Sequence, residues 1–384
     1  MTHDRHNLSR SCPRMALLTA LLAATPAAAE PDETLESGRV IVVRPGASVQ
    51  IAEKDPRPLP TGRVLDYSRR NENWLWVDSQ WGWVDEAAVK PLDEAETFFT
   101  ELIGKAEEDD REPGVELHQR GIVRLALGRP KEALADFDAA LEAGYKVANV
   151  HANRGRALLD AGDFDAAMEA MTEAIAINPE SGLAYNVRAS ALSGREFYDA
   201  ALTDADKSVE LEPGDAQFWY DRGQIQRSKG DHAAAVESFN EAIRLAPRFA
   251  EALTNRGFSL KRLGRPSKAA DDYRQAIKID PSLAVPHNDL AWLLATAKDE
   301  SLRDADEAVT LAERAVEIAE ADEEAALPLG QFLDTLAAAR AAAGDWEGAE
   351  EAGRRAVEAL EGADQFAADQ RLTGYLNKKA HVEK

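Results

Sequence analysis

From residue 114 onward, apolar and polar positions repeat every 34 residues, in the frames 114–147, 148–181, 182–215, 216–249 and 250–283. Position eight of every frame is small: Gly121, Gly155, Ala189, Gly223 and Gly257. Position twenty is always alanine, and position 24 is bulky in four frames, as Phe137, Met171, Phe239 and Tyr273. Small residues let two helices approach closely, and a large residue fills the gap that they leave. The pattern therefore predicts two packed helices in each frame.

Glycine and proline mark the expected ends of these helices. Position 32 is proline in four frames (Pro179, Pro213, Pro247 and Pro281), and proline cannot continue a helix. Glycine falls at the expected turn between the two helices, as Gly128, Gly162, Gly230 and Gly264. The pattern resembles the tetratricopeptide repeat (TPR), a unit of two antiparallel helices. The resemblance implies a mainly α fold, a TPR α-solenoid of helix-turn-helix repeats.

Two divergent copies of the repeat follow in residues 284–361. In the first, Ala291 and Ala308 lie seventeen residues apart rather than twelve, which predicts a five-residue insertion in the turn. Residues 362–384 carry Phe366, Leu372 and Tyr375 among charged residues, and we expect a helix there that caps the open end of the stack.

A β-rich segment precedes the repeats, in residues 38–92. RVIVV (39–43) and RVLDYS (63–68) read as strands, and NWLWVDSQWGWVDEAAV (73–89) alternates with period two on both sides of a turn, as a hairpin does. These residues resemble the end of a bacterial SH3-like domain, which implies a small all-β barrel that binds peptides or cell-wall material. Four tryptophans lie in the hairpin, and they either fill the core or form a binding platform. They are Trp74, Trp76, Trp81 and Trp83.

The first 29 residues have the layout of a secretory signal peptide. A basic start is followed by the apolar run MALLTALLAAT (15–25) and by small residues at Ala27 and Ala29. We expect cleavage between Ala29 and Glu30, export to the periplasm or the extracellular space, and no membrane span in the mature protein; retention as a membrane anchor is the alternative. An acidic linker (30–37) then leads to the β-rich segment, and a helix (93–113) connects that segment to the repeats.

Charge and residue content argue against several function classes. The net charge is −24, and residues 1–29 hold three Arg and one Asp, so the mature protein is near −26. Such a charge repels nucleic acid and anionic lipid. The single cysteine, Cys12, lies before the predicted cleavage site. The usual catalytic and phosphate-binding motifs are missing, and no two histidines of the mature protein lie within four residues of each other. We therefore expect no enzymatic activity, no cofactor and no metal.

An arginine recurs at position seven of all five regular frames, where the TPR pattern usually has leucine. This position faces the partner helix, and a buried arginine needs a carboxylate. Each frame supplies one at position 22 or 23, which predicts one ion pair per repeat rather than a basic binding strip. The expected pairs are Arg120–Asp136, Arg154–Glu169, Arg188–Asp204, Arg222–Glu237 and Arg256–Asp272.

In the TPR family, positions two, five, nine, twelve and thirteen of the first helix line a concave binding face. Mapped here, they predict a basic and aromatic site that would suit an acidic peptide or the carboxyl terminus of a protein: Tyr220, Gln224, Arg227, Phe258, Lys261, Arg262, Asn288 and Trp292. The alternative is that these cations complement helix dipoles and that the rings fill the stack. Two hypotheses follow: a scaffold that holds a protein or peptide on this face, or a cell-envelope protein whose SH3-like domain grips wall polymer or peptide.

Overall fold

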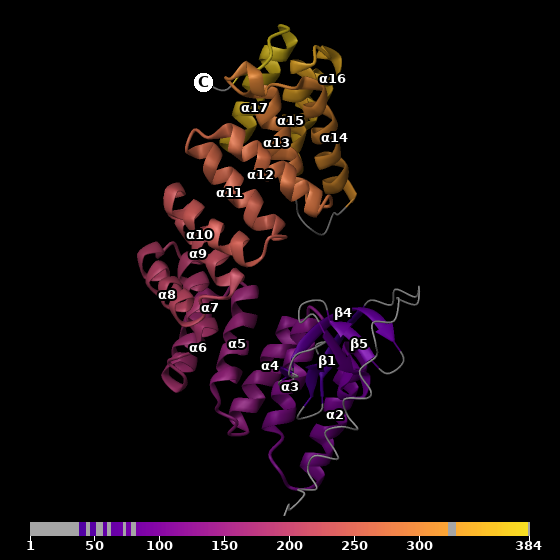
Figure 1. Ribbon diagram of the computed structural model, residues 1–384, viewed down its shortest axis with the longest axis vertical. Coiled ribbons are helices and arrows are strands. Elements are labelled where there is room, and N and C mark those ends of the chain that lie inside the picture. Colours follow the sequence, from indigo (N-terminus) through magenta and orange to yellow (C-terminus); the bar gives the residue numbers. More distant parts are fainter. Residues whose placement is uncertain are drawn as a thin grey trace, which may run out of the picture. The chain divides into compact units, whose positions relative to one another are not determined.

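The computed structural model of the 384-residue protein describes residues 38–43, 47–50, 57–59, 63–71, 74–77, 82–321 and 328–382 (Figure 1). The predicted signal peptide, the acidic linker and Trp81 lie outside these residues. The structure divides into two units, one up to Ala170 and one from Met171 onward. Within the described residues, no helix is both long enough and apolar enough to cross a membrane.

The first unit begins with a β-sheet. Its strands are β1 (Gly38–Val42), β2 (Ser48–Gln50), β3 (Arg57–Pro58), β4 (Val64–Asn71), β5 (Trp74–Val77), β6 (Gly82–Asp85) and β7 (Val89–Pro91). They pair in the order β3-β2-β6-β5-β4-β1-β7, with antiparallel neighbours throughout. Alternate residues enter the core, among them Val40, Val42, Leu75, Val77 and Val84, each at most 2% exposed. The short helix η3 (Glu86–Ala88) joins β6 to β7.

The expected hairpin is present, but a closed barrel is not shown. β5 and β6 pair so that Trp76 lies opposite Trp83 and Trp74 lies opposite Asp85. β2, β3 and β7 were not among the strands expected from the sequence. Among the described strands, β3 and β7 stand at opposite ends of the sheet and do not pair with each other. The strands of the described residues therefore form a small sheet that does not close, and the barrel implied by the SH3-like resemblance stays a prediction.

Helix α2 (Leu92–Glu108) connects the sheet to the repeats. Its apolar stripe includes Ala95 and Phe99, which pack in one cluster with Ile41 of β1 and Val123 of the following helix. Because Ala95 and Phe99 are at most 3% exposed, this helix fixes the sheet against the first repeat.

Each of the five regular frames forms two helices, which are labelled in Figure 1. Four frames form helix pairs within one unit: α3 (Gly114–Ala126) with α4 (Pro130–Glu142), α7 (Gly182–Gly194) with α8 (Tyr198–Leu211), α9 (Ala216–Lys229) with α10 (His232–Leu245), and α11 (Ala250–Arg262) with α12 (Pro266–Ile279). The second frame forms α5 (Ala148–Asp160) and α6 (Phe164–Ile177), and the boundary between the two units falls within α6. Positions 128, 162, 230 and 264 have positive φ, which explains the glycine at these turns.

The glycine at position eight leaves room for the aromatic ring at position 24. A Cβ on Gly223 would lie 2.7 Å from Phe239 Cε1, and a Cβ on Gly257 would lie 2.8 Å from Tyr273 Cε1. Both rings are fully buried. In the third repeat, position eight carries Ala189 instead of glycine, and position 24 carries Ala205 instead of a bulky residue. The larger residue at position eight is therefore accompanied by a smaller one at position 24. The helix pairs are thus matched in volume.

Five further helices complete the second unit. They are α13 (Ala284–Thr296), α14 (Ala305–Ala321), α15 (Leu329–Ala342), α16 (Trp346–Ala359) and α17 (Gly362–Leu376), with the short helix η4 (Glu300–Leu302) before α14. Residues 297–304 connect α13 to α14, five more residues than 263–265 between α11 and α12. α17 buries Leu372 and Tyr375 but leaves Phe366 65% exposed, so only one face of this helix packs against the stack.

Candidate functional site

Three of the five expected arginine pairs are present and bidentate. Arg120 binds Asp136 at 2.6 and 3.0 Å, Arg188 binds Asp204 at 2.7 and 2.9 Å, and Arg256 binds Asp272 at 2.6 and 2.8 Å. The three aspartates are at most 7% exposed. Their charges are therefore compensated inside the repeat, as a partly buried ion pair requires.

The other two expected pairs are wrong. Arg154 Nε lies 2.7 Å from Asp138 Oδ1, and Arg222 Nε lies 2.7 Å from Asp206 Oδ1, so both bind the preceding repeat. The residues expected as partners, Glu169 and Glu237, are exposed. They occupy position 22 of their frames, whereas the aspartates that pair within a repeat occupy position 23. One residue turns the side chain by about 100° around a helix, which moves it from the helix interface to solvent.

We call the arginines at position seven of the five frames the ladder arginines. In the second unit, each ladder arginine lies between two partners, one sixteen residues later in the sequence and one sixteen residues earlier. Arg188 also donates to Thr172 at 3.2 Å, and Arg256 donates to Asn240 at 2.9 Å. For Arg222 the order is reversed: the later partner is the Ser238 hydroxyl, at 2.8 Å, and the earlier partner is the Asp206 carboxylate. The ladder links neighbouring repeats, and its arginines are not available as a basic strip.

A second series of polar contacts joins the first helices of neighbouring repeats. Each contact joins position five of one frame to position six of the next. Asn153 Nδ2 lies 2.9 Å from His118 Nε2, Asn186 donates to Asp221 at 2.7 Å, and Asn255 donates to Tyr220 at 3.0 Å. The residue types vary from frame to frame, so the sequence period did not reveal this series.

The predicted site residues all lie on the first helices α9, α11 and α13, and we call the surface that they form the first-helix surface. Its basic end is built around Phe258. The Arg227 guanidinium lies 5.5 Å from the centre of this ring, and the His232 ring lies 6.0 Å from it. Burial lowers the pKa of His232, and the nearby Arg262 and Arg227 lower it further. The charges of Arg227 and Arg262 therefore act on the same neighbouring ring, which favours the neutral form of His232.

Arg227 and Arg262 differ from the ladder arginines in their partners. Arg227 donates to Gln224 at 3.3 Å, and its buried Nε has no hydrogen-bond partner. Within the described part of the sequence, neither Arg227 nor Arg262 forms an ion pair with a carboxylate. Two neighbouring guanidinium groups without an ion-pair partner could bind an anion through charge-assisted hydrogen bonds.

An aspartate that the prediction missed lies in the middle of the first-helix surface. Asn288 donates to Asp289 at 3.4 Å. Burial raises the pKa of Asp289, whereas the charges of Lys261 and Arg227 and the hydrogen bonds from Asn288 and Tyr273 lower it. Asp289 therefore interacts electrostatically with both Lys261 and Arg227, and its carboxylate, when ionised, offsets part of the charge of each.

The far end of the surface is covered by the protein itself. The Trp292 ring lies 5.6 Å from the His381 ring and 5.5 Å from the Arg371 guanidinium. The sequence predicted an open ring at Trp292, whereas the structure places His381 and Arg371 against it and leaves it half-buried.

Tyr220 has a structural role. Its hydroxyl accepts the Asn255 bond, and its ring lies 4.7 Å from the Phe249 ring. Burial raises its pKa to about 12, helped by the charges of Asp221 and Glu251. The phenol is therefore neutral and serves to join α9 to α11.

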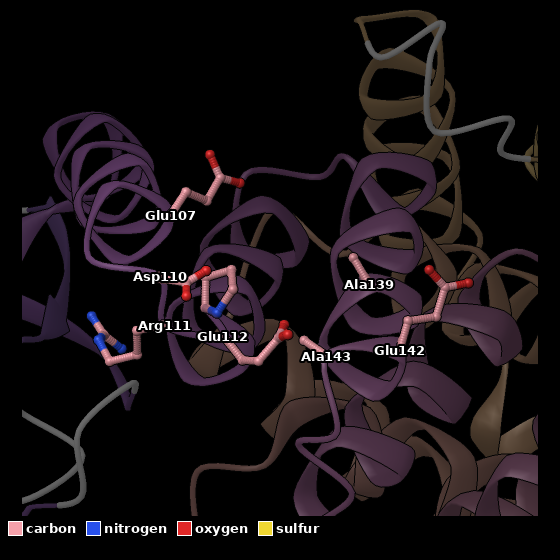
Figure 2. Close-up of a pocket in the computed structure, with 8 residues that line it drawn as sticks. Glu107, Asp110, Arg111, Glu112, Ala139, Glu142 and Ala143 are labelled. Atoms are coloured by element: carbon pink, nitrogen blue, oxygen red, sulfur yellow. The ribbon is translucent and has the colours of Figure 1, made fainter.

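A separate cavity of about 500 Å³ lies in the first unit, between the end of α2 and the end of α4 (Figure 2). Its wall is acidic, with Glu107, Asp110, Glu112 and Glu142. Arg111 also lines it and donates to Glu116 at 2.9 Å. Acidic side chains alone do not define a ligand, and among the described residues no group of three His, Cys, Asp or Glu is placed to hold a metal ion.

Comparison with known proteins identifies the repeats. Residues 118–182, 186–248 and 250–283 match family models described as tetratricopeptide repeat, so this part of the protein consists of TPR units. The TPR is generally a non-catalytic, protein-interaction fold. No curated protein matches the sequence.

Solved structures with a similar fold include proteins that are described as TPR proteins. The APC/C hetero-tetramer Cut9–Hcn1 is 18% identical with a TM-score of 0.53, covering 65% of this sequence and 46% of that one. YrrB, a TPR protein with an unusual peptide-binding site, is 22% identical with a TM-score of 0.39, covering 49% and 95%. MamA of Desulfovibrio magneticus RS-1 is 20% identical with a TM-score of 0.40, covering 44% and 96%.

Proposed function

We propose that this protein is a non-enzymatic scaffold that binds an acidic peptide or protein segment on the first-helix surface. One observation carries the proposal: Arg227 lies over the Phe258 ring, Arg262 and Arg227 both act on the neighbouring His232, and among the described residues neither arginine forms an ion pair with a carboxylate. The ladder arginines show that the sequence supplies acids where the fold needs them. Cations left without one are therefore available to an external anion.

The chemistry of the surface defines the class of partner. A carboxylate of the partner would bind the two guanidinium groups, with charge-assisted hydrogen bonds that are stronger than neutral ones. An apolar side chain next to it would cover the Phe258 ring, which is only partly buried. A segment that combines both features, such as an acidic stretch or the carboxyl terminus of a protein that ends in an apolar residue, fits this surface.

We further propose that the protein acts outside the cytoplasm. The support is the basic start, the short apolar run at 15–25 and the small residues before Glu30. N-terminal sequencing of the exported protein should give Glu30 as the first residue. A cytoplasmic protein that begins at Met1 would refute this part of the proposal and leave the binding surface unaffected.

Fluorescence anisotropy with a labelled pool of acidic peptides ending in Leu, Phe or Val tests the binding surface. The native protein should bind the pool saturably, and binding should weaken as salt rises from 0.05 to about 0.5 M. A pool with lysine in place of the acids is the control ligand and should not bind.

A double variant, Arg227→Gln with Arg262→Glu, should lose this binding while it keeps its helical circular dichroism. The matched control changes charge by the same amount on second helices: Arg244→Gln with Arg354→Glu, whose side chains are 63% and 58% exposed. Equal binding by the site variant and the control variant would refute the proposed surface.

A second candidate function is envelope binding through the sheet. The observation in its favour is the cross-strand pair Trp76 and Trp83 on the β5–β6 hairpin. Sedimentation of the native protein with purified cell-wall material, compared with Trp76→Ala and Trp83→Ala, tests it. Co-sedimentation that needs both tryptophans would favour this candidate over the first-helix surface.

A further inference from the structure

The residues that follow α17 turn back toward α13. The amide N–H of Lys378 donates to the carbonyl of Tyr375 at 2.8 Å, and that of Lys379 donates to the carbonyl of Gly374 at 3.0 Å. Lys378 has a φ of 54°, so the backbone reverses at this residue. The reversal directs the next residues to the first-helix surface, where the His381 ring lies 5.6 Å from the Trp292 ring.

α17 itself is firmly attached. Arg371 binds Asp334 of α15 through both guanidinium nitrogens, at 2.9 and 2.5 Å, and the same guanidinium lies over the Trp292 ring. Leu372 and Tyr375 are at most 6% exposed. A change in the segment after α17 therefore need not displace the helix.

The segment of residues 377–382 is attached differently. Of these six residues only His381 is partly buried, and the other five are exposed. The segment therefore buries little of its own surface. It is also basic, with Lys378, Lys379 and His381, and the charge of His381 acts on the Asp334 carboxyl.

We infer that residues 377–382 form a reversible, autoinhibitory cover over the Trp292 end of the first-helix surface. When the segment is in place, the His381 ring lies against the Trp292 ring at a tilt and restricts a partner's access to it. When the segment leaves, the part of the Trp292 ring that His381 contacts becomes accessible, while Arg371 stays over the ring. Trp292 then offers a second aromatic ring, at the same position as Phe258 in the neighbouring repeat. The effect on partner binding rests on the proposed function, whereas the contact itself does not.

The strength required of this contact can be bounded. A segment tethered next to its site has an effective concentration on the order of 1 mM. If the free segment binds with a Kd of about 0.1 mM, the cover is closed in roughly ten molecules for each open one. A partner that needs Trp292 would then bind about tenfold more weakly to the covered protein.

The test uses the segment as a ligand in trans. The probe is the fluorescein-labelled peptide of residues 377–384, and it is titrated into the full-length protein and into a shortened protein that ends at Leu376. The shortened protein keeps all of α17, and circular dichroism verifies that its helices remain. A peptide with His381→Ala is the control ligand, and Trp292→Ala in the shortened protein is the control site.

The peptide should bind the shortened protein with a Kd of about 0.1 mM or below and the full-length protein at least about tenfold more weakly. Both controls should abolish binding. Equal affinity for the two proteins, no binding to a folded shortened protein, or equal binding of the His381→Ala peptide would each overturn the inference.

The acidic peptide pool separates this inference from the proposed function. Tighter binding of the pool by the shortened protein supports both. If the 377–384 peptide binds as expected but neither protein binds the acidic pool, the cover stands and the proposed partner class fails.

Discussion

Gly223→Ala tests the volume matching that holds the two helices of a repeat together. The added Cβ would lie 2.7 Å from Phe239 Cε1 and 2.8 Å from Cδ1. Carbon atoms in contact are ordinarily about 3.5–4.0 Å apart, so either the ring or a helix must move by most of an ångström. The Phe239 ring is fully buried and cannot turn toward solvent. We therefore expect α9 and α10 to be forced apart.

Two opposing effects set the magnitude. Overpacking of a buried site costs about 1–3 kcal/mol in the free energy of unfolding. Replacing glycine by alanine inside a helix contributes about 1 kcal/mol in the stabilising direction. The net destabilisation should therefore be as much as about 2 kcal/mol, and a rigid site gives the upper value.

Urea unfolding followed by circular dichroism measures the effect, with Gly214→Ala as the control in the same unit. A Cβ on Gly214 would meet no atom within 4 Å, so this variant should be neutral or more stable by about 0.4–1 kcal/mol. The two variants should shift the midpoint in opposite directions.

The cause is assigned by repeating Gly223→Ala in a Phe239→Leu background. Leucine is shorter than the ring, so the added methyl should cost at least about 1 kcal/mol less there. If the two substitutions add within about 0.5 kcal/mol, the close approach of Gly223 to Phe239 is not what limits this position.

Three further predictions follow from buried charge and close contact. Burial lowers the pKa of His118 to about 4 from its ordinary 6.5, so the neutral ring is favoured in the fold. The free energy of unfolding should fall between pH 6.5 and 4 by as much as about 3 kcal/mol more in the native protein than in His118→Gln, and equal pH slopes would contradict this. Asp204→Asn should cost roughly 2–3 kcal/mol because it leaves Arg188 unpaired inside the repeat, whereas Asp138→Asn, at an exposed pair, should cost less than about 1 kcal/mol; chemical denaturation compares them. Ala235→Leu should melt earlier than Lys278→Leu, because Ala235 is fully buried and Lys278 is exposed.

Much of the repeat region could be predicted because its determinants are local and periodic. Small residues at position eight, alanine at position twenty and glycine at the turn depend on neighbours within one helix pair. The same holds for the longer turn between Ala291 and Ala308. The hairpin of β5 and β6 was predicted for the same reason, since alternation and a turn lie within one short stretch.

Contacts between distant residues needed the structure. The sequence offered an acid at position 22 or 23 in every frame, yet only the orientation of the second helix decides between Asp204, which is buried, and Glu237, which faces solvent. Neighbouring residues of a helix point about 100° apart around its axis. Which of two neighbouring positions faces the other helix therefore does not follow from the residue types alone.

The binding surface shows the same division. The sequence by itself determined which residues share the first-helix positions, because those positions repeat with the period of the fold. Only the tertiary structure placed Asp289 beside Lys261, and only it brought His381 onto Trp292, 89 residues earlier in the sequence. Such contacts depend on how separate repeats and the segment after α17 meet in space, and no local periodicity specifies that.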